Sequence, residues 1–127
     1  MSRILIILIA GVLAFPPAAA FAQDRSILVF FEPCDVQQLN DAIAAALTQP
    51  PFLLQTKNTP GALVVEIPDK ITTEHLKVSG TIWTFSVAFS RNGDRLGQSV
   101  ESCNEYKLSD CTDQLASDVK SAAGMGQ

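Results

Sequence analysis

The fold is decided by residues 80–103, which read GTIWTFSVAFSRNGDRLGQSVESC. Large apolar residues alternate with smaller or polar ones over the first half of this stretch: Trp83, Phe85, Val87 and Phe89. A period of two is typical of a strand with one buried face. Asn92-Gly93 is a strong hairpin signal, because both residues tolerate the positive φ of a type I′ turn. The stretch therefore predicts two long antiparallel strands joined by a two-residue loop.

The position of the turn also predicts the register of the hairpin. Counting outward from it gives these pairs: Arg91 with Asp94, Phe89 with Leu96, and Phe85 with Val100. The apolar pairs share one face, so the turn and the apolar pattern agree. Cys103 falls on the opposite face in this register. Leu76 and Val78 extend the first strand backward, with Gly80 as a bulge that switches faces.

Two further strands are expected before the hairpin. Ile27–Phe31 (ILVFF) is a continuous apolar run, as in a strand buried on both faces. Ala62–Ile67 predicts the second of these strands. Phe52–Leu54 is a short apolar extension between them, and Asp69–Glu74 is a polar connector.

Two helices complete the pattern. Asp35 and Gln38 form a capping box for the first helix, whose exposed face includes Asn40. Its apolar residues recur at helical spacing: Val36, Leu39, Ile43 and Leu47. Ser109 or Asp110 caps the last helix. The apolar face of that helix is also at helical spacing: Cys111, Leu115, Val119 and Ala122.

Together these patterns predict an α+β fold with elements in the order β-α-β-β-β-α. The sheet is expected to be small, mixed or antiparallel, with about four strands and both helices on one face. The expected core consists of the following residues: Leu28, Phe30, Leu39, Ile43, Leu47, Val65, Phe85, Val87, Phe89, Val100, Leu115 and Val119.

The first 22 residues are typical of a secretory signal peptide. Arg3 supplies a positive start, Ile4–Phe15 an apolar stretch, and Ala20-Phe21-Ala22 a cleavage site. The apolar stretch is shorter than the roughly 20 residues that a membrane-spanning helix needs. Cleavage would leave a single globular domain, residues 23–127, in the periplasm or outside the cell. Position 23 is Gln and not the Cys of a lipoprotein.

The charge of the chain argues against several classes of partner. Removal of residues 1–22 would take Arg3 with it and change the net charge from −4 to −5. An acidic chain without a basic stripe is a poor candidate for binding nucleic acid or anionic lipid. No second long apolar run follows, so no membrane insertion is expected after cleavage.

Three cysteines in an exported chain suggest one disulfide and one leftover thiol. We favour a Cys103–Cys111 disulfide, because their separation spans a strand end, a turn and a helix start. The predicted register counts against this pair, since it turns Cys103 away from the core, and a bond between Cys34 and Cys111 stays open. As the leftover thiol, Cys34 is either reactive or a small buried apolar residue between a strand and a helix.

The sequence shows no recognisable catalytic, metal or cofactor site, so the protein is not expected to be an enzyme. His75 is the one histidine, and no nucleophile motif lies near it. No set of His and Cys has a zinc spacing, and no glycine-rich phosphate loop follows a strand. The candidate binding loop is polar and carries an aromatic residue: Asn104, Glu105, Tyr106 and Lys107.

Three fragments together resemble the N-terminal α/β domain of the periplasmic translocation protein TolB. They are LNDAIAAAL at 39–47, VSGTI at 78–82 and AFSRNGDRL at 88–96. The chain is more loosely similar to periplasmic CsgG-like and penicillin-binding-protein-activator domains. The resemblance implies a sheet with two helices on one face and a role in contacts between envelope proteins. It carries over no site residue, because the cysteines are not part of that pattern.

These observations favour a non-enzymatic accessory protein that binds another envelope or extracellular protein. A first alternative is an inhibitor of a secreted enzyme, which would insert the disulfide-bound loop 104–110. A second alternative is an enzyme whose site the sequence does not reveal. An exposed sheet edge would favour the accessory protein, a protruding loop the inhibitor, and a pocket lined by His75 and carboxylates the enzyme.

The signal peptide predicts a mature chain that starts at Gln23. Intact-mass measurement of the protein from the periplasm or medium should give the mass of residues 23–127. An uncleaved chain with Met1 in a membrane fraction would contradict the predicted compartment.

Overall fold

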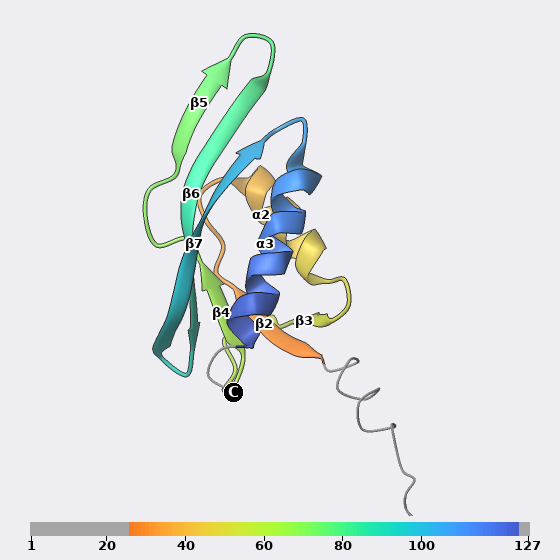
Figure 1. Cartoon of the computed structure of the whole chain (residues 1–127), viewed down its shortest axis with the longest axis vertical. Coiled ribbons are helices and arrows are strands. Elements are labelled where there is room, and N and C mark those ends of the chain that lie inside the picture. The colour runs from red at the N-terminus through yellow and green to blue at the C-terminus, as the bar shows by residue number, and fades with distance from the viewer. Residues whose placement is uncertain (1–25, 125–127) are drawn as a thin grey trace, which may run out of the picture.

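The predicted hairpin forms the centre of the structure, a computed structural model that describes residues 26–124 (Figure 1). Strand β6 (Gly80–Arg91) and strand β7 (Asp94–Asn104) are antiparallel neighbours. Asn92 and Gly93 between them have φ angles of 54° and 87°. Positive φ at both positions is what a type I′ turn requires, so the predicted two-residue loop is confirmed.

A β-bulge changes the register of this hairpin between Phe89 and Ser90. Phe89 pairs with Gly97 and not with Leu96, which is therefore an extra residue on β7. Side chains alternate along a strand, so one extra residue moves every later side chain to the other face. The predicted register is wrong from the bulge onward.

The shift decides which residues of β7 are buried. Phe85 pairs with Glu101 and not with Val100, and Val100 is 68% exposed. Glu101 and Cys103 point into the core instead and are 3% and 1% exposed. The predicted burial of Val100 is wrong, and the conflict between the register and the favoured disulfide disappears.

The sheet is mixed and has six strands, more than the predicted four. The remaining strands are β2 (Ile27–Phe31), β3 (Phe52–Leu54), β4 (Leu63–Glu66) and β5 (Thr72–Leu76). β2 is parallel to β3 and β4, whereas β4, β5 and β7 are antiparallel to β6. The order is β3-β2-β4-β6-β5, with β7 on the other side of β6. The predicted element order lacks β3 and β5.

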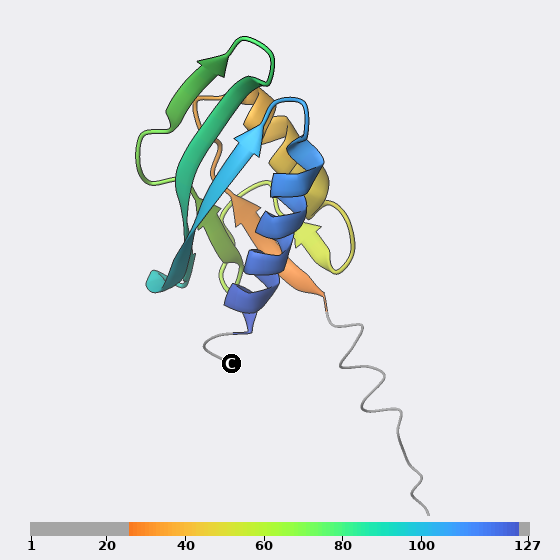
Figure 2. The same ribbon diagram turned by 45° about the horizontal axis from the view of Figure 1, so that its top comes forward.

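β5 occupies part of the predicted polar connector Asp69–Glu74, so that prediction is wrong. β5 pairs with residues 80–84 of β6, whereas β4 pairs with residues 88–91 along the same edge. The hairpin of β5 and the first half of β6 therefore extends past the helices (Figures 1 and 2). We call this hairpin, residues 72–84, the arm.

Gly80 ends the turn of the arm. It pairs with Leu76 and has a φ of 84°, a conformation that glycine adopts without steric cost. Val78 lies in the turn between the two strands. Leu76 and Val78 therefore do not extend β6 backward, contrary to the prediction, because the chain reverses direction at this turn.

Helices α2 (Gln37–Leu47) and α3 (Leu108–Ala123) lie on one face of the sheet, as predicted (Figure 2). Their buried residues include most of those predicted from helical spacing: Leu39, Ile43, Leu47, Cys111, Leu115, Val119 and Ala122. The core lies between these helix faces and the sheet.

The predicted helix caps are wrong at both helices. α2 begins after Val36, and Asp35 makes no capping bond. α3 begins after Lys107, so Ser109 and Asp110 lie inside the helix and not at its cap. Lys107 donates its backbone N–H to the carbonyl of Asn104, so a backbone turn and not a side chain leads into α3.

The predicted core is mostly buried, with exceptions on the first strand. The buried members are Leu39, Ile43, Leu47, Val65, Phe85, Val87, Phe89, Leu115 and Val119. Leu28 is 39% exposed and Phe30 is half-buried, whereas Val29 and Phe31 face the core. The helices cover only one face of the sheet, so the prediction of a strand buried on both faces is wrong.

The predicted signal peptide, residues 1–22, lies outside the described residues. Within residues 26–124, no helix is both long enough and apolar enough to cross a membrane.

The shifted register predicts opposite outcomes for two apolar residues of the hairpin. Phe85→Ala should lower the free energy of unfolding by about 3–5 kcal/mol, because it leaves a cavity in the core. Val100→Ala should change it by no more than about 0.5 kcal/mol, because Val100 is exposed. Urea unfolding followed by circular dichroism measures both values. A large loss at Val100 would support the register without the bulge.

Candidate functional site

A cavity of about 520 Å³ lies beside β5. Residues 33–36, which link β2 to α2, form one wall. Residues 67–71, which link β4 to β5, form the other wall together with Thr73. β4 and β5 follow one another along the same edge of β6, and β2 lies on the outer side of β4. Because β2 ends at Phe31, where the chain turns towards α2, it does not continue along the outer side of β5. We call this cavity the β5 hollow.

Cys34, predicted as the leftover thiol, lines the β5 hollow and is unpaired. Its backbone N–H donates to Oδ1 of Asn40 at 2.8 Å, and Nδ2 of Asn40 donates to its carbonyl at 2.8 Å. Its Sγ donates to the carbonyl of Val36 at 3.6 Å. Asn40 was expected on the exposed face of the helix but is only 9% exposed. The two hydrogen bonds between the Asn40 side chain and the Cys34 backbone fix the chain at the start of α2, in place of the predicted Asp35 cap.

The structure does not bring Cys34 and His75 together. His75 is exposed on the arm, where Nδ1 lies 3.1 Å from Oγ1 of Thr81, and it does not line the β5 hollow. No group of three or more His, Cys, Asp or Glu among residues 26–124 could hold a metal ion. The β5 hollow therefore offers a shaped surface and a thiol without a histidine base.

β5 has a free edge next to the β5 hollow. All five of its residues are exposed, and within residues 26–124 it pairs with β6 alone. Along its outer side, backbone N–H and C=O groups have no neighbouring strand, which makes such an edge a template for pairing with another chain.

The charged groups that line the β5 hollow are mainly acidic. Asp35 and Asp69 line the β5 hollow together with Lys70, and Glu74 lies on β5 itself. In the lining of the β5 hollow, two carboxylates against one ammonium group favour a cationic side chain over an anionic one.

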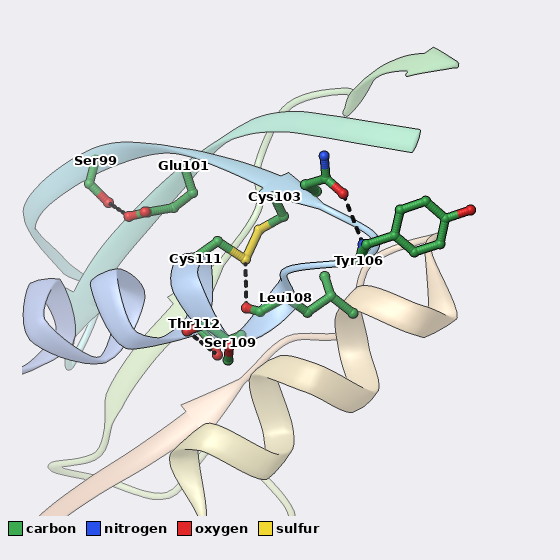
Figure 3. Close-up of a disulfide and its surroundings, with 9 residues drawn as sticks. Ser99, Glu101, Cys103, Tyr106, Leu108, Ser109, Cys111 and Thr112 are labelled. Atoms are coloured by element: carbon green, nitrogen blue, oxygen red, sulfur yellow. Dashed lines mark hydrogen bonds between the residues drawn. A yellow bond between two sulfur atoms is a disulfide. The ribbon is translucent and has the colours of Figure 1, made fainter. Parts of the chain in front are cut away.

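The predicted binding loop, Asn104–Lys107, is fixed to the first residues of β6. Glu105 donates its backbone N–H to the carbonyl of Thr81 at 2.9 Å, and Thr81 donates its N–H to Oε1 of Glu105 at 2.8 Å. Tyr106 donates its N–H to Oδ1 of Asn104 at 2.9 Å (Figure 3). The loop therefore has a defined shape and braces the end of the arm.

Tyr106 and two apolar residues of the arm form an exposed patch. The Tyr106 ring lies over Gly80, where a Cβ atom would stand 2.5 Å from its Cε2. Gly80 pairs with Leu76, and Val78 lies in the turn between them. Tyr106, Leu76 and Val78 are 72%, 37% and 91% exposed. We call these three residues the tip patch.

A disulfide joins Cys103, near the end of β7, to Cys111, in the first turns of α3 (Figure 3). The two Cα atoms are 5.2 Å apart, and the cysteines are eight residues apart in sequence. This is the pair favoured from the sequence. It closes a short loop that contains residues 104–107, so the tip patch and the covalent link between sheet and helix are neighbours.

Glu101 is a buried carboxyl that faces α3. Ser99 donates to its Oε2 at 2.9 Å (Figure 3). Burial, a hydrogen bond to Asp118 and the negative charge of Asp118 together raise the pKa of Glu101 from its ordinary 4.5 to about 7, against the opposing effect of the Ser99 bond. A buried carboxyl beside a second carboxyl is a familiar arrangement in functional sites.

The sequence pattern did not reveal this acid pair, although it contains a signal. Glu101 and Cys103 are two residues apart on one strand and so share a face. A disulfide from Cys103 to the covering helix turns Glu101 inward as well, whatever the turn predicts about register.

Comparison with known proteins leaves the family open. No family model matches the chain, and no curated protein matches it, so the resemblance to TolB and CsgG-like domains is not confirmed. Among solved structures, a minor lipoprotein from Acinetobacter baumannii, determined at 2.35 Å, is similar over 72% of this chain and 86% of that chain. The sequence identity is 15% and the TM-score is 0.46. The function is therefore inferred from the geometry of this chain.

The disulfide predicts one free thiol per chain, at Cys34. Thiol titration of unfolded, unreduced protein should give one group, and peptide mapping should place it there. Cys111→Ala should expose a second thiol and lower the free energy of unfolding by about 2.5 kcal/mol, through loss of the short covalent loop. Cys34→Ala is the matched control and should fold with the disulfide intact. A free thiol mapped to Cys103 or Cys111 would contradict this pairing.

Proposed function

We propose that the protein is a small exported binding module that captures an extended segment of a partner protein along the free edge of β5. The observation that carries the proposal is β5 itself. Its five residues are exposed, and it pairs on one side only within residues 26–124. Thr72–Leu76 contains no proline and no bulge, two devices that commonly protect a sheet edge from pairing.

A captured segment would pair with the outer side of β5, the side away from β6, just as β2 pairs with the outer side of β4. Main-chain hydrogen bonds would supply most of the affinity, and alternate side chains would supply specificity. A segment of a few residues would also reach the β5 hollow, where residues 33–36 and 67–71 leave about 520 Å³ for a side chain. The carboxylates of Asp35 and Asp69, which outnumber the one ammonium group of Lys70 in the lining, favour a Lys or Arg there.

An inhibitor of a secreted enzyme is the second candidate, and the tip patch favours it. Tyr106 is exposed on its loop. Two links hold this loop in place: its hydrogen bonds to Thr81 and the Cys103–Cys111 disulfide. A rigid loop with an exposed aromatic residue is suited to insertion into a cleft, because little entropy is lost on binding.

Site-specific photo-crosslinking separates these two functions. A photoreactive phenylalanine analogue replaces Glu74 on β5, Tyr106 on the loop, or Ser117 on the exposed side of α3 as the control. Each tagged variant is irradiated in its own envelope or secreted fraction, and the crosslinked peptides are sequenced. Strand capture predicts a crosslink from position 74 to an extended segment of one protein and none from position 117.

The alternatives give different patterns. A crosslink from position 106 alone, to an enzyme cleft, would favour the inhibitor. Equal yields from all three positions, or none from 74 and 106, would contradict both. With the captured segment made as a synthetic peptide, Asp69→Asn should weaken binding several-fold, whereas Asp113→Asn on α3 should not.

A further inference from the structure

We propose that Glu101 and Asp118 form a proton-operated clasp that fastens α3 to β7 and loosens it when Glu101 loses its proton. The clasp is independent of the proposed binding function. It concerns the face of the sheet that the helices cover and not the edge beside the β5 hollow.

Glu101 and Asp118 are placed so that a bond between them attaches α3 to β7. Asp118 follows Cys111 by seven residues, which is two helical turns, so both side chains project from one side of α3. The disulfide to Cys103 holds the beginning of the helix, and the acid pair holds its middle. Glu101 is two residues before Cys103 on β7 and is 3% exposed. The disulfide and the acid pair therefore join the same strand, β7, to the same helix, α3, at two successive positions.

The chemistry of the pair makes it dependent on a proton. Two carboxyl groups form a hydrogen bond only when one of them carries a hydrogen to donate. The protonated Glu101 donates to Asp118, while Ser99 donates to Glu101 Oε2 at 2.9 Å. Gln114 donates from Nε2 to Oδ1 of Asp118 at 3.2 Å and so helps to orient it. Loss of the proton replaces this hydrogen bond with the repulsion of two carboxylates.

Among the described residues, no cation is one of the groups that shift the pKa of Glu101. The groups that act on the Glu101 carboxyl are Asp118 from α3 and Ser99 from its own strand, while β6 presents Phe85 opposite it. Arg95 donates to Oε1 of Gln98 at 3.2 Å. A buried carboxylate without a counter-ion is strongly unfavourable, so deprotonation favours a state in which water reaches the pair.

A small hollow beside Asp118 and Ser99 offers the route for that water. It has a volume of about 140 Å³, and its lining includes Ser99, Asp118 and Ser121. The disulfide keeps the first turns of α3 attached, so opening is confined to the later turns, residues 115–123. Those turns carry Leu115, Val119 and Ala122, which would become exposed.

The direction of the pH effect follows from the raised pKa of Glu101, which lies at about 7 in the folded protein against 4.5 ordinarily. The stabilising effect of the proton is complete below pH 4.5 and is lost as the pH rises through 7. α3 should therefore be held more firmly in acid than in weak alkali, the reverse of ordinary acid denaturation.

Amide hydrogen exchange tests the clasp. Exchange rates of residues 115–123, corrected for the intrinsic effect of pH, are measured at pH 4.5 and pH 8.5. Protection should fall by about 150-fold over this range, as follows from a Glu101 pKa of about 7 in the folded protein and 4.5 in the opened state. Glu101→Gln should remove the dependence on pH, whereas Asp113→Asn, an exposed residue of the same helix, should retain it.

Two further measurements keep the proposal open to refutation. If Glu101→Gln does not fold, Asp118→Asn serves instead and should shift the transition to lower pH. Carbon NMR of the Glu101 carboxyl in the unaltered protein should titrate near pH 7, and a midpoint below 5 would overturn the clasp. An equal loss of protection in β2 and β4 would also overturn it, because it would mean global unfolding. Persistence of the pH dependence in Glu101→Gln would do the same.

Discussion

A one-residue bulge between Phe89 and Ser90 determines which side of β7 meets α3. Without it, Val100 and Ser102 would face the helix, and Glu101 and Cys103 would face solvent. With it, a cysteine and a carboxyl are the groups that β7 presents to α3. The covalent link between sheet and helix and the buried acid pair both depend on that single extra residue.

The regular parts of this fold follow from the sequence because they depend on local periodicity. The period of two from Trp83 to Phe89 and the turn at Asn92-Gly93 were sufficient to predict the central hairpin. Helical spacing was sufficient to predict the buried faces of both helices. A bulge has no comparable pattern, since Leu96 is as acceptable in a regular strand as in an irregular one. The predicted register was therefore wrong where tertiary packing decided it.

The candidate site was predicted less well, for a related reason. β5 reads as a polar connector, because a strand exposed on both faces lacks the apolar alternation that marks a buried one. Asn40 likewise reads as a solvent-facing residue of the helix, although its amide binds both backbone groups of Cys34. Such features depend on partners distant in sequence or on unoccupied edges. The disulfide was predictable because its cysteines lie on either side of one short turn.

The arm extends past the helices, so no layer packs beneath much of it, and a two-stranded hairpin is marginal on its own. The loop that follows β7 supplies the missing support. Glu105 forms two hydrogen bonds with Thr81, and the ring of Tyr106 closes over Gly80 at the turn. The disulfide in turn holds that loop against α3. An edge strand that is ordered before binding loses less entropy when a partner strand pairs with it. Under the proposed function, the disulfide on the covered face would therefore favour capture at the open edge.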